Sequence, residues 1–145
     1  MLRGRVAAIS VSRRRGEKKT QVEVAVLGEG FGIVGDAHAG TERQVSLLQM
    51  ESISRVREEG LPVGPGDFAE NIVTEGLDLS RVKVGDRLYI GDSVVLEVTQ
   101  KGKECHSPCW IFRSLGRCIM PEEGIFAKVV RVGTIRRGDP VECRK

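Results

Sequence analysis

The sequence predicts a mostly β, barrel-like fold with one or two short helices, built as one domain over residues 1–145. Three observations predict it. Short runs rich in Val, Ile and Leu recur along the chain, glycine contributes 18 residues, and the dipeptide Gly-Asp occurs five times. Each Gly-Asp is a turn signal, because glycine accepts a positive φ and aspartate hydrogen-bonds to its own downstream backbone. Short strands separated by such turns are typical of an all-β barrel or sandwich.

The composition indicates a folded, water-soluble protein. Hydrophobic residues make up 40% and charged residues 30% of the chain, and the net charge is only +3, so nucleic acid is not an expected partner. No apolar run approaches the roughly 20 residues that span a bilayer, and the N-terminus lacks the apolar stretch of a signal peptide. We therefore expect a cytoplasmic protein without membrane contact. In that reducing compartment its 4 cysteines are interpreted as thiols, metal ligands or catalytic groups rather than disulfides.

Two strands are expected near the N-terminus, at residues 5–11 and 21–27, because both are rich in Val, Ile and Ala. Residues 12–20 between them carry five cations around one glycine, Lys19 among them, which predicts a solvated hairpin tip. Residues 28–43 are rich in glycine, but their spacing does not complete a dinucleotide-binding motif. A loop this long in a compact domain is usually functional.

The helix expected in the middle of the chain rests on Met50, Ile53 and Val56, which recur every third residue, and on Gly60 as its stop signal. Short apolar runs and turn clusters define the other elements. The predicted order is a strand at 45–48, the helix at 50–59, turns at 61–67, a strand at 68–73, a loop or helical turn at 77–82, a hairpin of 87–90 and 94–98, and strands at 124–132 and 141–143.

The hairpin is the clearest of these elements, because its strands flank Gly91-Asp92, a glycine-first turn that matches strand twist. Asp67, Asp86 and Asp139 also follow glycines and are predicted to form turns rather than to act as acids. No strand–helix–strand alternation and no internal repeat is visible.

The chemistry is expected directly after the hairpin, where three residues, His106 among them, separate Cys105 from Cys109, and Cys118 follows nine positions beyond Cys109. A thiol close to cations loses its proton more readily, and the thiolate is the nucleophile and the metal ligand. The cations of this segment are Lys101, Lys103, Arg113 and Arg117.

Three interpretations of this segment stay open. Cys105, His106, Cys109 and Cys118 could form a structural zinc site, although no second matching pair follows. Individual cysteines could be small buried residues without chemistry, which is the preferred interpretation for Cys143. The interpretation preferred here is a reactive or metal-binding thiolate at Cys105 or Cys109.

Four stretches, taken together and in this order, resemble the MOSC domain, a family first recognised at the C-terminus of molybdenum cofactor sulfurases. The resemblance extends over roughly residues 5–143, and the small stand-alone bacterial members are the most similar type. The four stretches are Gly66–Asn71, Val84–Gly91, Lys103–Cys109 and Gly124–Asp139.

The resemblance implies a β-rich barrel that binds molybdenum cofactor (molybdopterin) in a pocket beside a family cysteine. That cysteine either ligates molybdenum or carries sulfur as a persulfide. The common family cysteine follows an Arg-Pro or similar pair; here Cys109 follows Pro108, whereas Cys105 lies nearer the strand end, so both remain candidates for the catalytic and molybdenum-binding thiol. The implied cofactor-binding residues are His38, Arg43, Glu70, Asn71, Lys101, Lys103, His106 and Arg113.

For three of these residues a purely structural role is the alternative. Glu70 and Asn71 could hold the start of a strand through hydrogen bonds to the backbone, and His38 could be a loop histidine with satisfied hydrogen bonds.

The expected function is therefore molybdenum cofactor binding with sulfur transfer or cofactor-dependent reduction. Relatives include sulfur carriers and reductases of N-hydroxylated compounds, and no residue separates the two. Expected partners are proteins of cofactor biosynthesis or molybdoenzymes, together with a small-molecule substrate; pyridoxal phosphate is not expected. Two alternatives remain: a non-enzymatic module that delivers the cofactor, and a zinc-stabilised barrel that binds RNA through the tip at residues 13–19.

Overall fold

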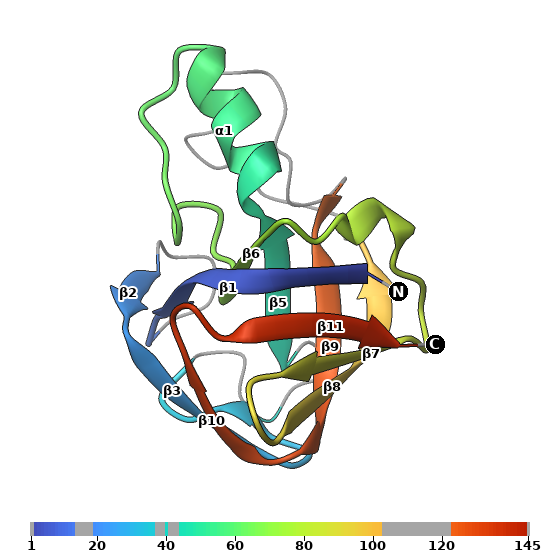
Figure 1. Ribbon diagram of the computed structural model, residues 1–145. Coiled ribbons are helices and arrows are strands. Elements are labelled where there is room, and N and C mark those ends of the chain that lie inside the picture. The colour runs from blue at the N-terminus through green and yellow to red at the C-terminus, as the bar shows by residue number, and fades with distance from the viewer. Residues whose placement is uncertain (1, 14–18, 37–39, 41–43, 103–122, 145) are drawn as a thin grey trace.

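A closed β-barrel carrying a helix at one end forms the body of the protein in a computed structural model, which describes residues 2–13, 19–36, 40, 44–102 and 123–144 (Figure 1). The mostly β, barrel-like class predicted from the sequence is confirmed. The described elements are β1 (Leu2–Val11), β2 (Thr20–Val22), β3 (Val24–Gly28), β4 (Gly32–Ile33), β5 (Val45–Gln49), α1 (Met50–Glu58), β6 (Ile72–Glu75), the 3₁₀ helix η1 (Leu79–Arg81), β7 (Arg87–Ile90), β8 (Val94–Lys101), β9 (Ile125–Arg131), β10 (Gly133–Arg136) and β11 (Pro140–Arg144).

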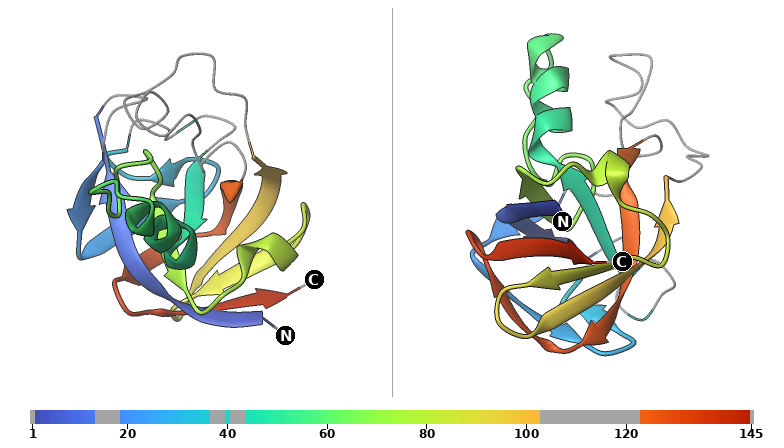
Figure 2. Two further views of the ribbon diagram at one scale, coloured as in Figure 1. Left: turned by 90° about the horizontal axis from the view of Figure 1, so that it is seen from above. Right: turned by 45° about the vertical axis from the view of Figure 1, so that its right-hand side comes forward.

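The two ends of the described chain close the barrel. Within the described residues, seven strands follow one another around the ring in the order β1, β6, β5, β9, β8, β7 and β11, and β11 pairs back with β1. That antiparallel pairing places Leu2 opposite Cys143 and Arg5 opposite Pro140, so the termini lie side by side (Figure 2). Cys143 is buried in this closing strand, as the preferred interpretation of that residue requires.

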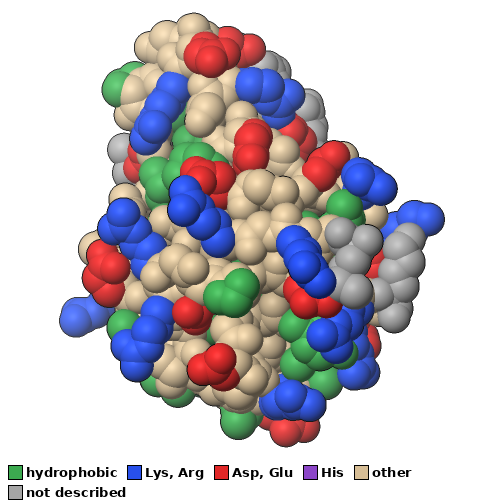
Figure 3. Space-filling view, in the orientation of Figure 1, with side chains coloured by type: hydrophobic (Ala, Val, Ile, Leu, Met, Phe, Trp, Pro, Cys, Tyr) green, Lys and Arg blue, Asp and Glu red, His purple; other side chains and the backbone are tan. Residues whose placement is uncertain are grey.

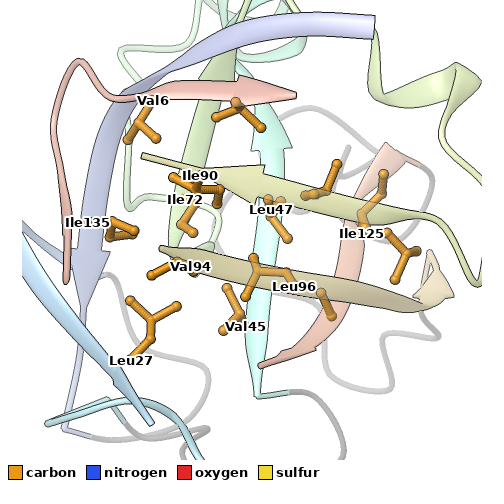
Figure 4. Packing of buried hydrophobic residues seen from close by; sticks show 14 of the residues in the cluster. Val6, Leu27, Val45, Leu47, Ile72, Ile90, Val94, Leu96, Ile125 and Ile135 are labelled. Atoms are coloured by element: carbon orange, nitrogen blue, oxygen red, sulfur yellow. The ribbon is translucent and has the colours of Figure 1, made fainter. Parts of the chain in front are cut away.

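Every second residue of the ring strands points inward, and the residues at these positions are mainly Val, Ile and Leu, so the core is aliphatic. Leu47, Ile72, Leu96 and Ile125 come from four different strands, and each is fully buried in one cluster inside the barrel (Figure 4). The intervening residues point to the outside of the ring, where part of the wall is covered by α1 and its connections. The site described below lies on that covered outer wall.

The connection from β5 through α1 to β6 is a strand–helix–strand unit, which the sequence did not reveal. β5 and β6 run parallel, with Leu47 opposite Ile72. The unit escapes pattern reading because β5 has five residues and β6 only four. α1 buries Ile53 and Val56 in a second apolar cluster against the outside of the barrel wall. It ends at Glu58, one residue earlier than predicted, and Gly60 follows with a φ of +105°, which is typical of a helix stop.

The predicted strand at 68–73 is wrong in its first half, because the strand begins only at Ile72. Ala69 has a positive φ of +62°, and the Phe68 N–H donates to a Glu70 carboxylate oxygen, so this part of the chain turns instead of extending. The predicted hairpin of β7 and β8 is confirmed: Ile90 pairs with Val94, so the loop consists of residues 91–93, as the predicted bounds of the two strands imply.

The turn role predicted for three aspartates is confirmed by one shared geometry. In each case a side-chain oxygen accepts a hydrogen bond from the backbone N–H three residues earlier in the chain, rather than from the downstream backbone that the sequence analysis expected. The pairs are Asp67 with Gly64 (2.9 Å), Asp86 with Lys83 (2.9 Å) and Asp139 with Arg136 (2.8 Å).

A small second sheet of β10, β3 and β4 extends the barrel at the end opposite α1 (Figure 1). Strand β10 was not predicted separately. Ala25, Leu27 and Ile135 point from this sheet into the main core. Among the described residues, no helix is both long and apolar enough to cross a bilayer.

Gly4 of β1 provides a test of the barrel packing, because a Cβ added there would lie 2.6 Å from the backbone oxygen of Glu75 and the backbone nitrogen of Leu77. Overpacking of this kind typically destabilises a fold by about 1–3 kcal/mol. We predict that Gly4→Ala lowers the free energy of unfolding by that amount in chemical denaturation. Gly28→Ala is the matched control, because its Cβ would meet Phe31 at an ordinary 3.4 Å. Equal stability of the two variants would contradict the described packing.

Candidate functional site

A pocket of about 580 Å³ opens where α1, η1 and the ends of β8 and β9 meet. Small-molecule sites commonly have volumes of roughly 300–1,000 Å³. Lys101 ends β8 and Gly124 precedes β9, so the pocket borders both ends of the connection that carries Cys105 and Cys109 in the sequence. The lining residues are Gln49, Glu51, Arg55, Asp78, Leu79, Ser80, Lys101, Glu123 and Gly124.

Several charged side chains of the pocket form hydrogen bonds or ion pairs with other residues that line it. Lys101 Nζ donates to the Ser80 backbone oxygen at 3.0 Å, and Arg55 pairs with Glu123. Asp78 accepts from both the N–H and the hydroxyl of Ser80, and the hydroxyl bond lowers the pKa of that carboxyl. The pocket is therefore lined by cations and carboxylates together, rather than by cations alone. Among the predicted cofactor-binding residues that the structure describes, Lys101 is the one that lines it.

Glu70 is a fully buried carboxyl at the start of β6. The Gly66 N–H donates to both of its oxygens, at 2.8 and 2.9 Å, and the Phe68 N–H donates to one of them at 3.3 Å. Burial nevertheless dominates, because it disfavours the charged form, and it raises the pKa of Glu70 from its usual 4.5 to about 7. Glu70 therefore holds the turn before β6 and titrates near neutral pH.

Asn71, also fully buried, directly precedes β6 and binds β5 and β1 on the outside of the barrel wall. Its Oδ1 accepts from the Ser46 N–H at 3.0 Å and from the Ser46 hydroxyl at 3.1 Å. Its Nδ2 donates to the Ser10 backbone oxygen at 3.1 Å. These hydrogen bonds hold the chain before β6 to β5 and to β1. They agree with the alternative in which Asn71 holds the start of a strand rather than a cofactor.

The Ser10 hydroxyl lies beside Asn71 and finds no hydrogen-bond partner among the residues that the structure describes, although Ser10 is only 1% exposed. It points toward the Gly66 turn, since a Cβ placed on Gly66 would lie 3.3 Å from it. A buried polar atom left unpaired is rare in native structures and marks a place where a ligand or water can supply the missing partner.

Lys19 corrects one part of the predicted solvated tip, because its side chain is completely buried, whereas Arg13 is exposed and residues 14–18 lie outside the described residues. The Lys19 Nζ donates to Asp36 Oδ1 at 2.7 Å and to the Ser12 hydroxyl at 3.1 Å, and the Asp36 side chain is completely buried as well. The Lys19 N–H also donates to the Gly66 oxygen at 2.9 Å. No periodicity reveals this pair, since Lys19 stands in a run of cations and Asp36 in a glycine-rich loop.

Most of the site residues predicted from the sequence lie outside the described residues. Glu70 and Asn71 stand together at the start of β6, whereas Lys101 stands in the pocket. The two places are linked by β5, because Ser46 contacts Asn71 and Gln49 lines the pocket; three residues of strand span roughly 10 Å. Outside the described residues lie His38, Arg43, Lys103, Cys105, His106, Cys109, Arg113, Arg117 and Cys118.

Glu70 predicts a pH dependence of stability whose sign follows from its raised pKa. The folded state binds the proton more tightly than the unfolded state, so this contribution is full below about pH 4.5 and is lost as the pH rises through about 7. The shift corresponds to about 3 kcal/mol. We expect the difference in unfolding free energy between wild type and Glu70→Gln to change by that order across this range. Glu58→Gln, at an exposed position of α1, should show no such change, and a flat difference for Glu70→Gln would contradict the assignment.

Asn71→Ala should destabilise the fold by about 3 kcal/mol, because it removes several buried hydrogen bonds and leaves partner groups unsatisfied. Thermal and chemical denaturation measure this loss. A loss below about 1 kcal/mol would argue that Asn71 serves a ligand rather than the barrel wall.

Comparison with known proteins identifies the family. The family model described as MOSC domain matches residues 34–142. A protein from Gibberella moniliformis named "Reductase" is 31% identical in an alignment of 136 residues that covers 85% of this chain and 24% of that protein. The chain thus spans about a quarter of that relative's length.

Solved structures share the fold. The YuaD protein from Bacillus subtilis superposes with a TM-score of 0.82 at 19% identity, covering 98% of this chain and 96% of that one. YiiM from Geobacillus stearothermophilus gives 0.72 at 19% identity, covering 98% and 75%. YiiM from Escherichia coli gives 0.65 at 24% identity, covering 97% and 70%. The family model matches most of the chain, and the barrel has the fold of these proteins: the chain belongs to the MOSC domain family.

Proposed function

We propose that this protein binds molybdenum cofactor beside the connection between β8 and β9, and that Cys109 or Cys105 on that connection ligates molybdenum or carries sulfur. The observation that carries the proposal is the position of the pocket. Its volume suits a small molecule, and its wall contains the residues at both ends of the segment with the two cysteines. A thiolate beside a pocket can reach a bound ligand, and soft thiolates suit metal–sulfur centres.

The described residues fit such a cofactor. Lys101 and Arg55 offer N–H donors in the pocket. The three carboxylates among the lining residues oppose a phosphate, so we assign the cofactor's phosphate to cations of the glycine-rich loop or of the cysteine segment, with Arg43, Lys103 and Arg113 as candidates. When bound, the cofactor would supply the metal centre at which electrons or sulfur are exchanged.

Between the two activities, reduction is favoured by the name of the curated relative, "Reductase", over sulfur transfer. This chain matches only about a quarter of that protein, so its name supports reduction for the matched part and no more. The RNA-binding alternative receives less support. Figure 3 shows cations and acids interspersed over the face that it presents, and Lys19 is withdrawn from the basic tip into a buried ion pair.

The variant Cys105→Ala/Cys109→Ala tests the proposal. We expect bound molybdenum per chain, measured by elemental analysis after purification from a molybdenum-replete host, to fall at least tenfold, because the thiolate closest to the metal is removed. Mass spectrometry of the peptide with Cys105 and Cys109 would show a persulfide if the thiol carries sulfur instead. The two single variants identify the functional thiol.

Cys143→Ala is the matched control, since Cys143 lies in β11 and its Sγ lies 3.8 Å from Asp86 Oδ2 rather than beside the pocket. It should keep wild-type molybdenum content. Full molybdenum content in the double variant, with no persulfide in the wild type, would refute a role for either thiol.

A further inference from the structure

The small second sheet of β10, β3 and β4 buries one of its faces and exposes the other. Ala25 and Leu27 of β3 point into the main core. Because side chains alternate along a strand, Val24 and Val26 point outward, and they are 43% and 52% exposed. The solvated face of an antiparallel sheet normally carries polar side chains. An apolar outer face therefore makes this sheet a candidate contact surface.

Two more apolar side chains join the outer face. The Val34 N–H donates to the Val26 oxygen at 3.0 Å, which continues the pairing of β3 with β4 and places the two valines opposite each other. Phe31 lies beside Gly28, since a Cβ on that glycine would meet Phe31 atoms at 3.4 to 3.9 Å. Four of the six large apolar side chains that are exposed in the described part of the chain thus gather here. A contiguous apolar group exposed on a soluble domain commonly serves as an interaction surface.

The two ends of this outer face carry charges of opposite sign. Arg136 of β10 is paired with Val24 in the ladder, so it lies at one end, and Glu29 follows β3 at the other end. Both side chains are exposed, and neither forms an ion pair with another of the described residues. Glu23 and Arg137, near the Arg136 end, already pair with each other at 3.3 Å. The outer face therefore offers one cation and one carboxylate that a second copy of the same face could complement.

We propose that two copies of this chain associate through the outer face of the second sheet, around a two-fold axis that crosses β3 at Val26. Such a contact is self-complementary, because each copy presents the same patch to the other. The axis reverses the strand direction between the copies, so Arg136 of one copy meets Glu29 of the other, and this happens twice. The apolar side chains then pack between two charge pairs, as in interfaces with an apolar centre and a polar rim.

The size of the face indicates a weak dimer. β3, β4 and β10 contain 5, 2 and 4 residues, whereas a stable interface takes roughly 20–30 residues from each partner. We therefore expect a dissociation constant in the micromolar range. The second sheet and α1 lie at opposite ends of the barrel, so the pocket beside α1 stays open in the dimer (Figure 1). The proposal does not depend on the cofactor.

Sedimentation velocity of the wild-type chain over about 5 to 500 µM tests the proposal. We expect the sedimentation coefficient to rise with concentration from the value of a monomer to that of a dimer. Val26→Lys should stay monomeric over the whole range, because it places like charges against each other at the axis. Val84→Lys is the matched control and should dimerise like the wild type, since Val84 is 60% exposed in a turn before β7, outside the second sheet.

Exchanging the two end charges tests the two-fold arrangement. Arg136→Glu and Glu29→Arg should each raise the dissociation constant at least tenfold, because like charges then meet at both ends of the interface. The double variant Arg136→Glu/Glu29→Arg restores opposite charges, and its dissociation constant should return to within about threefold of the wild-type value. These exposed positions also decide the question if circular dichroism shows that Val26→Lys does not fold.

Three results would overturn the proposal. The first is a wild-type chain that stays monomeric up to the highest concentration. The second is a dimer that a folded Val26→Lys variant leaves intact, because the copies then meet through another surface. The third is an exchanged double variant that binds no more tightly than the two single variants, because the two charges then do not face each other across the axis.

Discussion

The antiparallel pairing of β1 with β11 closes the barrel, and the arrangement of the site depends on it. Closure pairs the free edge of β1 with β11 over Leu2 to Arg5 and so fixes the first part of that strand. The same strand continues past the ring to Ser10 and Ser12, which contact Asn71 and Asp36. A strand anchored at one end by ring closure thus presents at its other end the groups that organise the connections around the site.

The outside of the wall formed by β1, β6 and β5 buries several polar groups. Ser46, Glu70 and Asn71 are all nearly inaccessible there, although a small barrel has an apolar interior available for its core. Buried polar groups are costly unless their hydrogen bonds are satisfied, and here nearly all of them bind backbone groups of neighbouring segments. The network therefore specifies how the connections lie, while the aliphatic interior provides most of the stability.

The fold class could be predicted from the sequence because short apolar runs and glycine–aspartate turns indicate where the strands lie. Asp67, Asp86 and Asp139 show this well, since a glycine followed by aspartate has a local geometry that does not depend on the rest of the chain. The strand–helix–strand unit was missed because parallel pairing of β5 with β6 is a long-range property of two very short strands. Lys19 was misassigned for a similar reason: its burial is created by Asp36, a residue 17 positions away.

For the site, the sequence pointed to the segment with Cys105 and Cys109 but not to most of the residues that line the pocket beside it. Lys101 was found because cations cluster around the cysteines, and it does line the pocket. Arg55 and Glu123 could not be found in this way, since they stand 68 positions apart and meet only through the barrel. Glu70 was selected through a family resemblance, and only the structure shows that its carboxyl is directed at the Gly66 turn.

Anomalous diffraction at the molybdenum absorption edge, from crystals of protein purified from a host that makes the cofactor, tests the central claim most directly. The account predicts one anomalous peak per chain, on the outer wall near β5 and beside the connection from β8 to β9. A peak elsewhere on the barrel would contradict it. Well-ordered crystals of this protein that give no anomalous molybdenum peak would contradict it as well.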